Sequence, residues 1–400
     1  MGELSWRPSA PQELLLKACL LADGPAATAL AAWLAQPQAQ RRDTASRRLL
    51  PLLWLRWQAS GALPAAEQAA GKQQMLLTWG QNQRRLGQAR ALASAFAQAD
   101  IPLLLVKGLP LAMQVYSSLA ARPMGDLDLV VPYPRAEAAA ALLVERGWRP
   151  APTPLKGAED PATCKRHPWL CQPRPLAALD PVYRQVRSGH AFRHADGSEL
   201  DLHWFVFHEQ CTPGIDDDLW AHAQPLNGPL LAPAAADHLL LLLAHGCRWD
   251  LQPPIRWVAD AVLLLRNGSL DWDRFLAVAQ QRRLAAVAEP LLTYLVETFA
   301  IAVPAAVPPA LARLARRRPL GSALARQGAG RPDLFGAAQN MTYLFQRWQW
   351  LRGATPAVEQ AWRVGGFDHF LCHVMGIPGR RALLRYALGE RQRRSIKGQL

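Results

Sequence analysis

Two aspartates stand two residues apart inside an otherwise apolar strand pattern, in the segment 122–131 (Arg-Pro-Met-Gly-Asp-Leu-Asp-Leu-Val-Val). Side chains two apart in a strand share a face, so Asp126 and Asp128 should point the same way while Leu127 and Leu129 point to the opposite face. Two carboxylates roughly 7 Å apart, from about 3.4 Å of rise per residue, are poorly suited to a hydrophobic core. They are well suited to a divalent metal ion, which prefers oxygen ligands.

A Lys-Gly pair interrupts the apolar pattern upstream of these acids. Residues 101–106 form a strand-like apolar run that is broken at Lys107-Gly108, after which apolar residues resume at helical spacing as far as residue 116. The pattern predicts a strand, a tight turn and a helix, with the lysine and the glycine at the turn.

A third carboxylate lies on a second predicted strand. Apolar residues alternate with Asp201 and His203 over residues 200–204, so these two side chains should share the polar face. Residues 190–194 form a preceding strand, and the Asp196-Gly197 dipeptide between them is typical of a tight hairpin turn.

These segments, in this order, resemble the DNA polymerase beta-type nucleotidyltransferase superfamily, and within it a family of uncharacterised bacterial nucleotidyltransferases. That family has Lys-Gly, then Arg-x-Met-x-Asp-hydrophobic-Asp, then Asp-hydrophobic-His. The matching positions here are Lys107-Gly108, Arg122, Met124, Asp126, Asp128, Asp201 and His203. The resemblance covers roughly residues 90 to 290. It departs from most of the superfamily in one respect, because no serine follows Gly108 to meet a phosphate.

The resemblance implies an enzyme that moves a nucleoside monophosphate from a nucleoside triphosphate such as ATP to a hydroxyl, phosphate or amine of a small molecule, peptide or protein. In-line attack on the alpha-phosphate would use two Mg²⁺ ions, with Mn²⁺ as a substitute. Asp126 and Asp128 would bind both ions, and Asp201 would bind the ion on the acceptor side and help to deprotonate the nucleophile.

Three basic or small residues fit nucleotide binding. Gly108 would let the backbone approach a phosphate, and Lys107 or Arg122 would balance the triphosphate charge. His203 is expected to support the metal ligands or to pack beside them rather than to bind the metal.

Each assignment has an alternative that the sequence leaves open. An Asp-x-Asp pair also occurs in surface loops and calcium sites, Lys107-Gly108 could be a plain turn with a solvated lysine, and Arg122 could pair structurally with an acid. Four residues at helical spacing are expected to form a buried polar network between helices rather than to contact substrate: His238, His245, Trp257 and Asp260.

Composition narrows the class of protein. The chain has 400 residues and a formal charge of +14, which favours phosphate-rich ligands and leaves RNA open as a partner. The Walker loop, the dinucleotide fingerprint and the His-Glu-x-x-His motif are absent from the sequence. The six cysteines lack paired metal spacing, although Cys164, His167 and Cys171 could form a zinc cluster. No apolar stretch reaches a membrane span and no signal-peptide layout is seen, so a cytoplasmic protein is expected.

We expect an α/β (α+β) fold, with a small mixed-sheet polymerase beta-like core flanked by helical regions. The predicted parts are an N-terminal helical region at 1–95, a catalytic core at 96–232 with an insertion at about 150–188, and a C-terminal helical domain at 233–400. Predicted helices span 13–22, 26–35, 44–58, 73–99, 109–120 and 135–146, and predicted strands span 101–106, 126–131 and a hairpin near 189–207. The basic tail at 391–397 is predicted to be a solvated end.

A second hypothesis is a non-catalytic module that keeps this fold and binds nucleotide or RNA in its basic cleft. The presence of all three acids favours the enzyme. The acceptor, the preferred base and the oligomeric state cannot be read from the sequence.

Overall fold

The computed structural model describes residues 6–151, 184, 187–208, 210–246, 255–268, 270–316, 344–345, 348, 366–375 and 379–385. The chain divides into two compact units. The first unit is Met1–Asp128 with Asp218–Tyr343, and the second is Leu129–Asp217 with Leu344–Leu400. The boundary falls inside a strand, between Asp128 and Leu129. The predicted division into three domains stays a prediction.

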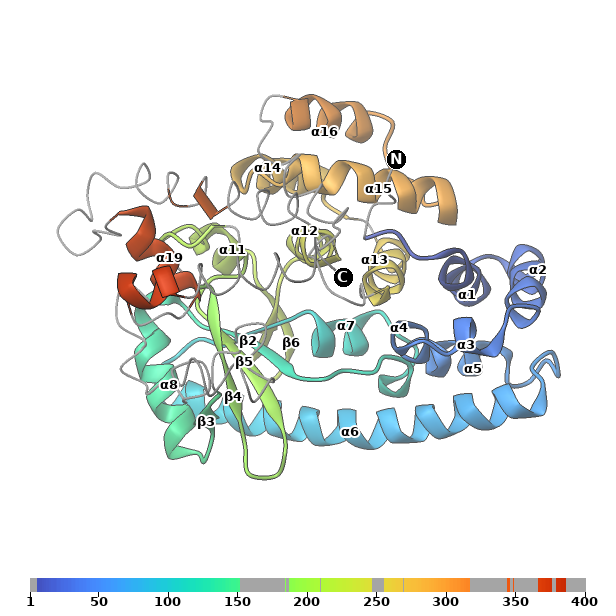
Figure 1. The fold of residues 1–400 in the computed structure, drawn as a ribbon, viewed down its shortest axis with the longest axis horizontal. Coiled ribbons are helices and arrows are strands. Elements are labelled where there is room, and N and C mark those ends of the chain that lie inside the picture. The colour runs from blue at the N-terminus through green and yellow to red at the C-terminus, as the bar shows by residue number, and fades with distance from the viewer. Residues whose placement is uncertain are drawn as a thin grey trace. The chain divides into compact units, whose positions relative to one another are not determined.

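The first unit begins with the helices that the apolar periodicity predicts (Figure 1). They are α1 (Ala10–Leu20), α2 (Asp23–Leu34), α3 (Gln38–Arg41), α4 (Thr44–Arg47), α5 (Leu50–Trp57) and α6 (Ala65–Gln98). The helix predicted over 44–58 is in fact two helices. Pro51 is the reason, because proline lacks an N–H and is accommodated in the first turn of a helix, where α5 begins.

Helix α6 is 34 residues long and starts earlier than predicted, directly after Pro64. Its second half buries Leu86, Ala89, Leu92 and Phe96, which are three or four residues apart and so lie on one face. Earlier in the helix, the buried Asn82 amide donates to the carbonyls of Leu119 and Arg122 at 2.6 and 2.8 Å, and this holds the Arg122 segment against α6.

The strands form a seven-stranded mixed sheet, which agrees with the expected fold class. They are β1 (Leu104–Val106), β2 (Leu127–Val130), β3 (Arg149–Pro150), β4 (Gly189–Arg193), β5 (Glu199–His203), β6 (Gln224–Asn227) and β7 (Leu230–Ala232). Their order is β3-β4-β5-β2-β1-β7-β6. In the first unit β1 pairs with β7 in parallel and β6 with β7 antiparallel, and in the second β3, β4 and β5 pair antiparallel.

The predicted β4–β5 hairpin is present. Ala191 pairs with Asp201, and Gly197 in the turn has a φ of +82°, a conformation that glycine adopts without a steric cost. The sequence reading missed the β6–β7 hairpin, although Asn227-Gly228 is a common hairpin turn. Gly228 there has a φ of +59°.

The rest of the first unit is helical, as predicted from residue 233 onward. The core α-helix, α12 (Ala235–Gly246), buries all of Leu239 to Leu243 and packs against α13 (Arg256–Arg266), α14 (Trp272–Gln281) and α15 (Ala285–Phe299). The remaining elements of the first unit are α7 (Gly108–Gln114), a 3₁₀ turn η1 (Leu119–Ala121), α11 (Asp217–Ala221, at the boundary) and α16 (Val307–Arg316).

The second unit adds helices to its strands. They are the 3₁₀ turn η2 (Tyr133–Arg135), α8 (Ala136–Glu145) and α19 (Phe367–Met375). Most of the predicted insertion at 150–188, with its Cys164–Cys171 cluster, and the whole basic tail lie outside the described residues. No helix in the described ranges combines the length and the apolar character that a membrane crossing requires.

Candidate active site

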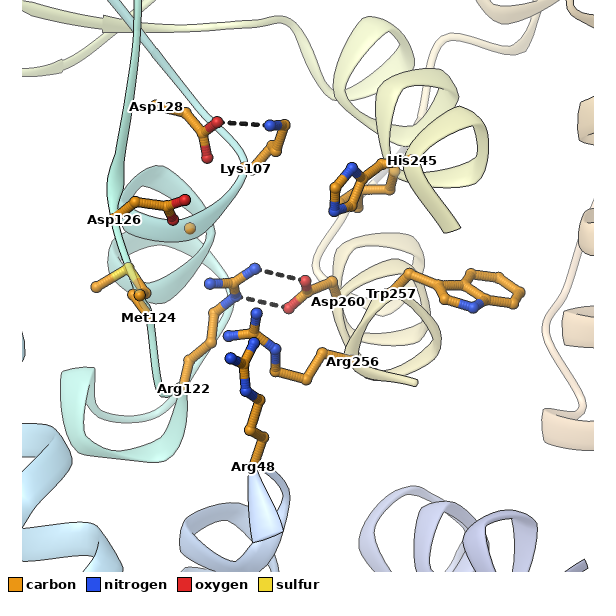
Figure 2. Close-up of a pocket in the computed structure, with 13 residues that line it drawn as sticks. Arg48, Lys107, Arg122, Met124, Asp126, Asp128, His245, Arg256, Trp257 and Asp260 are labelled. Atoms are coloured by element: carbon orange, nitrogen blue, oxygen red, sulfur yellow. Dashed lines mark hydrogen bonds and ion pairs between the residues drawn. The ribbon is translucent and has the colours of Figure 1, made fainter. Parts of the chain in front are cut away.

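A pocket of about 390 Å³ lies in the first unit, and three separate parts of the sequence line it (Figure 2). Arg48 comes from the end of α4, and helices α12 and α13 supply residues that include His245, Arg256 and Asp260. The motif segments supply the rest of the charged lining: Lys107, Arg122, Asp126 and Asp128. The volume falls in the usual range for small-molecule sites, about 300–1,000 Å³.

The two motif aspartates differ in burial but share a side of the strand. Asp126 precedes β2 and is exposed, Leu127 is buried, and Asp128 in β2 is only 8% exposed. Figure 2 shows both carboxylates on the pocket side of this segment, as the alternation of a strand requires. Asp126 also acts on Arg85, whose pKa is lowered by burial and is raised in part by the Asp126 charge.

Lys107 lies between β1 and α7 and connects two other polar residues of the unit. Its ammonium bonds to Oδ1 of Asp128 at 2.5 Å, and its backbone N–H donates to Nε2 of His238 at 3.1 Å. Its φ of +57° and ψ of −106° are costly for a residue with a side chain. The lysine is therefore not the solvated turn residue of the alternative interpretation, because its charge neutralises Asp128.

His238 is buried and neutral. Burial is the main cause that lowers its pKa to about 4. A neutral ring can leave Nε2 unprotonated, which is what the hydrogen bond from Lys107 N–H requires. The histidine thus holds the strained turn as a hydrogen-bond acceptor.

Arg122 makes a bidentate ion pair with Asp260. Nε and Nη2 donate to the two carboxylate oxygens at 2.7 and 2.6 Å, and the Tyr116 hydroxyl donates to Oδ1 at 2.6 Å. Burial acts to lower the pKa of Arg122, but the Asp260 charge and hydrogen bonds outweigh it and raise the pKa. Burial and Asp260 also raise the pKa of Tyr116.

Two of the four residues expected to form a polar network between helices bond to the motif segments. His238 and Asp260 contact Lys107 and Arg122 of the motif segments, whereas a network between helices was expected. His245 and Trp257 line the pocket.

Gly108 allows two motif segments to pack closely. A Cβ at this position would lie 2.8 Å from Sδ of Met124 and 3.1 Å from Nη1 of Arg122. Both contacts are closer than a real Cβ tolerates without movement, so the Lys-Gly and Arg-x-Met motifs form one packed unit.

In the second unit, Asp201 and His203 project from the same side of β5, and both are half-buried. Val131, next to β2 in sequence, donates its N–H to the His203 carbonyl at 2.9 Å, so β5 runs beside the continuation of β2. Gly189 pairs with His203 in the hairpin, and a Cβ there would lie 2.7 Å from Nδ1 of His203. The glycine leaves room for the imidazole ring.

One group in the described part of the chain has the composition of a metal site. Asp128 of the first unit, and Asp201 and His203 of the second, could each offer a ligand atom. Two carboxylates and an imidazole suit a divalent cation. Asp126 is not in this group, and His203, which was expected to support the ligands, is in it.

A family model described as uncharacterised nucleotidyltransferase matches residues 42–300. The chain belongs to this family. No curated protein matches it. The family predicted from the motifs is thus confirmed, and the match begins well before the predicted start near residue 90. This nucleotidyltransferase is accordingly an enzyme of the transferase class, with a mixed α/β fold.

Two pocket residues of this nucleotidyltransferase escaped the sequence reading. Arg256 is four residues before Asp260, on the same face of α13, and that spacing was a usable signal. Arg48 follows a four-residue helix in a segment without a chemical motif, so nothing local marked it.

Proposed function

We propose that this protein transfers a nucleoside monophosphate from a nucleoside triphosphate to a hydroxyl, phosphate or amine of a small-molecule, peptide or protein acceptor, and releases pyrophosphate. The observation that carries the proposal is the pocket in which Asp126 and Asp128 face Lys107 in a member of a nucleotidyltransferase family. The proposal covers the reaction and leaves the acceptor open.

The donor set is compatible with divalent metal, and we assign Mg²⁺, as two ions, to Asp126, Asp128 and Asp201. All three are carboxylates, whose oxygens are ligands that Mg²⁺ prefers. When bound, such ions would stabilise charge on the attacking and leaving oxygens. His203 would support Asp201 or complete the metal shell.

The chain's own residues carry the other tasks in this proposal. Asp201, half-buried on β5, would accept the proton of the attacking group. Lys107, which bonds to Asp128, would offer its ammonium to a phosphate oxygen. Arg122, fixed by Asp260, would offer Nη1 at the wall of the pocket.

The test is to incubate the purified full-length protein with each labelled triphosphate and magnesium, and to measure pyrophosphate release and self-labelling. Wild type should release pyrophosphate, and Asp126→Asn or Asp128→Asn should abolish most of it. Asp273→Asn is the matched control, because Asp273 is exposed on α14. Magnesium-dependent nucleotide binding without any product, across many acceptors, would instead support the non-catalytic binding module.

A further inference from the structure

The pocket has a second charged end, formed by Arg48 and Arg256. We infer that these two arginines form a subsite for the terminal phosphate of the nucleoside triphosphate. The inference rests on the proposed transfer reaction and adds to it the group that recognises a triphosphate as opposed to a monophosphate.

The acidic partners of the lysine and arginine side chains in the pocket lining show which of these cations are available to bind an anion. Lys107 is paired with Asp128, and Arg122 is paired with Asp260. Neither Arg48 nor Arg256 has an acidic partner at salt-bridge distance among the residues that the structure describes. Within the described ranges, the pocket therefore contains two guanidinium groups without a salt-bridge partner of their own, although the charge of Asp260 acts on Arg256.

Arg256 is held at the start of α13 with part of its hydrogen-bonding capacity unused. Its Nη1 donates to the Pro123 carbonyl, while its buried Nε has no hydrogen-bond partner within the described ranges. Burial lowers the pKa of Arg256 to about 10, and the charges of Arg122 and Arg48 add to this effect. A bound anion would remove the repulsion between these cations.

Arg48 reaches the pocket from a rigid turn. Asp43 caps α4 by accepting from the N–H groups of Ala45 and Ser46, and both of these residues are buried. The Arg48 side chain itself is exposed. Figure 2 shows its guanidinium beside that of Arg256, which agrees with the electrostatic effect of one on the other.

The arrangement favours a polyphosphate over a single anion. In Figure 2 the Arg122–Asp260 pair lies between the acidic end, at Asp126 and Asp128, and the end formed by Arg48 and Arg256. An alpha-phosphate at the acids would direct the remaining phosphates along the pocket toward these arginines. The planar guanidinium fork matches phosphate oxygens in two-point contacts, which supports phosphate as the bound group.

Arg48→Gln is the most informative variant, since an exposed side chain without an acidic partner in the described ranges can be changed without loss of the fold. Arg47→Gln is its matched control, with the same charge change one residue away and outside the pocket lining. The probes are inorganic tripolyphosphate and the four nucleoside triphosphates with their monophosphates, titrated by calorimetry in the presence of magnesium.

We expect Arg48→Gln to weaken tripolyphosphate and triphosphate binding about 10- to 100-fold, which is typical for the loss of charge-assisted hydrogen bonds. Monophosphate binding should change by less than about 2-fold, and Arg47→Gln should leave all probes unaffected. Arg256→Lys, which keeps the charge but loses the fork, should also reduce the preference for triphosphate over monophosphate.

Three outcomes would overturn the inference: no tripolyphosphate binding by wild type, equal losses for monophosphates and triphosphates, or no loss in Arg48→Gln. If Arg48→Gln raised only the concentration of acceptor that the reaction requires, the group bound by these arginines would be an anionic group of the acceptor and not the terminal phosphate. Failure of the transfer reaction is separable, because it would appear as absent pyrophosphate release while tripolyphosphate binding still depended on Arg48.

Discussion

The buried pair between Arg122 and Asp260 provides a strong test of how this site is held together. Asp260→Asn removes the negative charge and places an amide NH₂ where one carboxylate oxygen accepts from Nη2 or Nε of Arg122, at 2.6 and 2.7 Å. Arg122 is 5% exposed and Asp260 is 2% exposed, so water cannot replace the lost partner. The arginine would be left as an uncompensated buried charge.

Breaking a buried ion pair from one side typically costs about 3–5 kcal/mol of folding free energy. That is a large part of the roughly 5–15 kcal/mol that stabilises a domain. In urea unfolding, with a slope of about 2 kcal/mol per molar, the midpoint should fall by roughly 1.5–2.5 M. Circular dichroism would follow the transition, with Asp273→Asn as the control that should leave the midpoint unchanged.

The double variant Arg122→Met with Asp260→Asn separates charge from packing. Removal of both partners eliminates the buried charge, and the amide oxygen introduced by Asp260→Asn can still accept from the Tyr116 hydroxyl. The double variant should therefore be more stable than Asp260→Asn alone. A single variant within about 1 kcal/mol of wild type, or a double variant equal to the sum of the two single losses, would refute this reasoning.

Three further predictions concern the same site. We expect turnover to fall by roughly a thousandfold or more, at about 1.4 kcal/mol per tenfold, in each of three variants, Asp126→Asn, Asp128→Asn and Asp201→Asn, and by less in His203→Ala. Pyrophosphate release would measure these losses of turnover. Near-full activity in an acid variant would contradict the metal assignment. Gly108→Ala should lower the thermal unfolding temperature, because its Cβ would approach Sδ of Met124 to 2.8 Å, and Gly125→Ala, with open space around it, should not. His238 has a folded pKa of about 4, below its ordinary 6.5, so the unfolded chain binds more protons than the folded chain between these pH values. The contribution of the neutral His238 to the free energy of unfolding is fully present above pH 6.5 and should fall by about 3 kcal/mol as the pH drops to 4. Urea midpoints of wild type and His238→Gln across this range would show whether the pH dependence of stability comes from His238.

The sequence was sufficient to predict the motif strands, because their signals are local. Alternation placed Asp126 with Asp128 and Asp201 with His203, and Asp196-Gly197 marked the hairpin turn. The break between α4 and α5 was missed since apolar spacing continues across it, although Pro51 signals a helix start. The β6–β7 hairpin was missed because each strand is too short to show a period.

The partners across the fold could not be predicted in the same way. Arg122 and Asp260 are 138 residues apart, and nothing in either local pattern indicates that one neutralises the other. Arg48 reaches the pocket only because the N-terminal helices pack in the first unit with the motif segments. Such pairings depend on tertiary packing, which local periodicity does not encode.

The backbone of Lys107 has a consequence for how this position can change. Glycine adopts the Lys107 φ of +57° and ψ of −106° more readily than other residues do, and a residue with a side chain there has about 1–3 kcal/mol of backbone strain. Judged by its backbone conformation alone, glycine would be the preferred residue here. A Lys107→Gly variant should relieve this backbone strain, but it also leaves the buried Asp128 without its counter-charge, which typically costs about 3–5 kcal/mol, so the ion pair outweighs the backbone preference at this position.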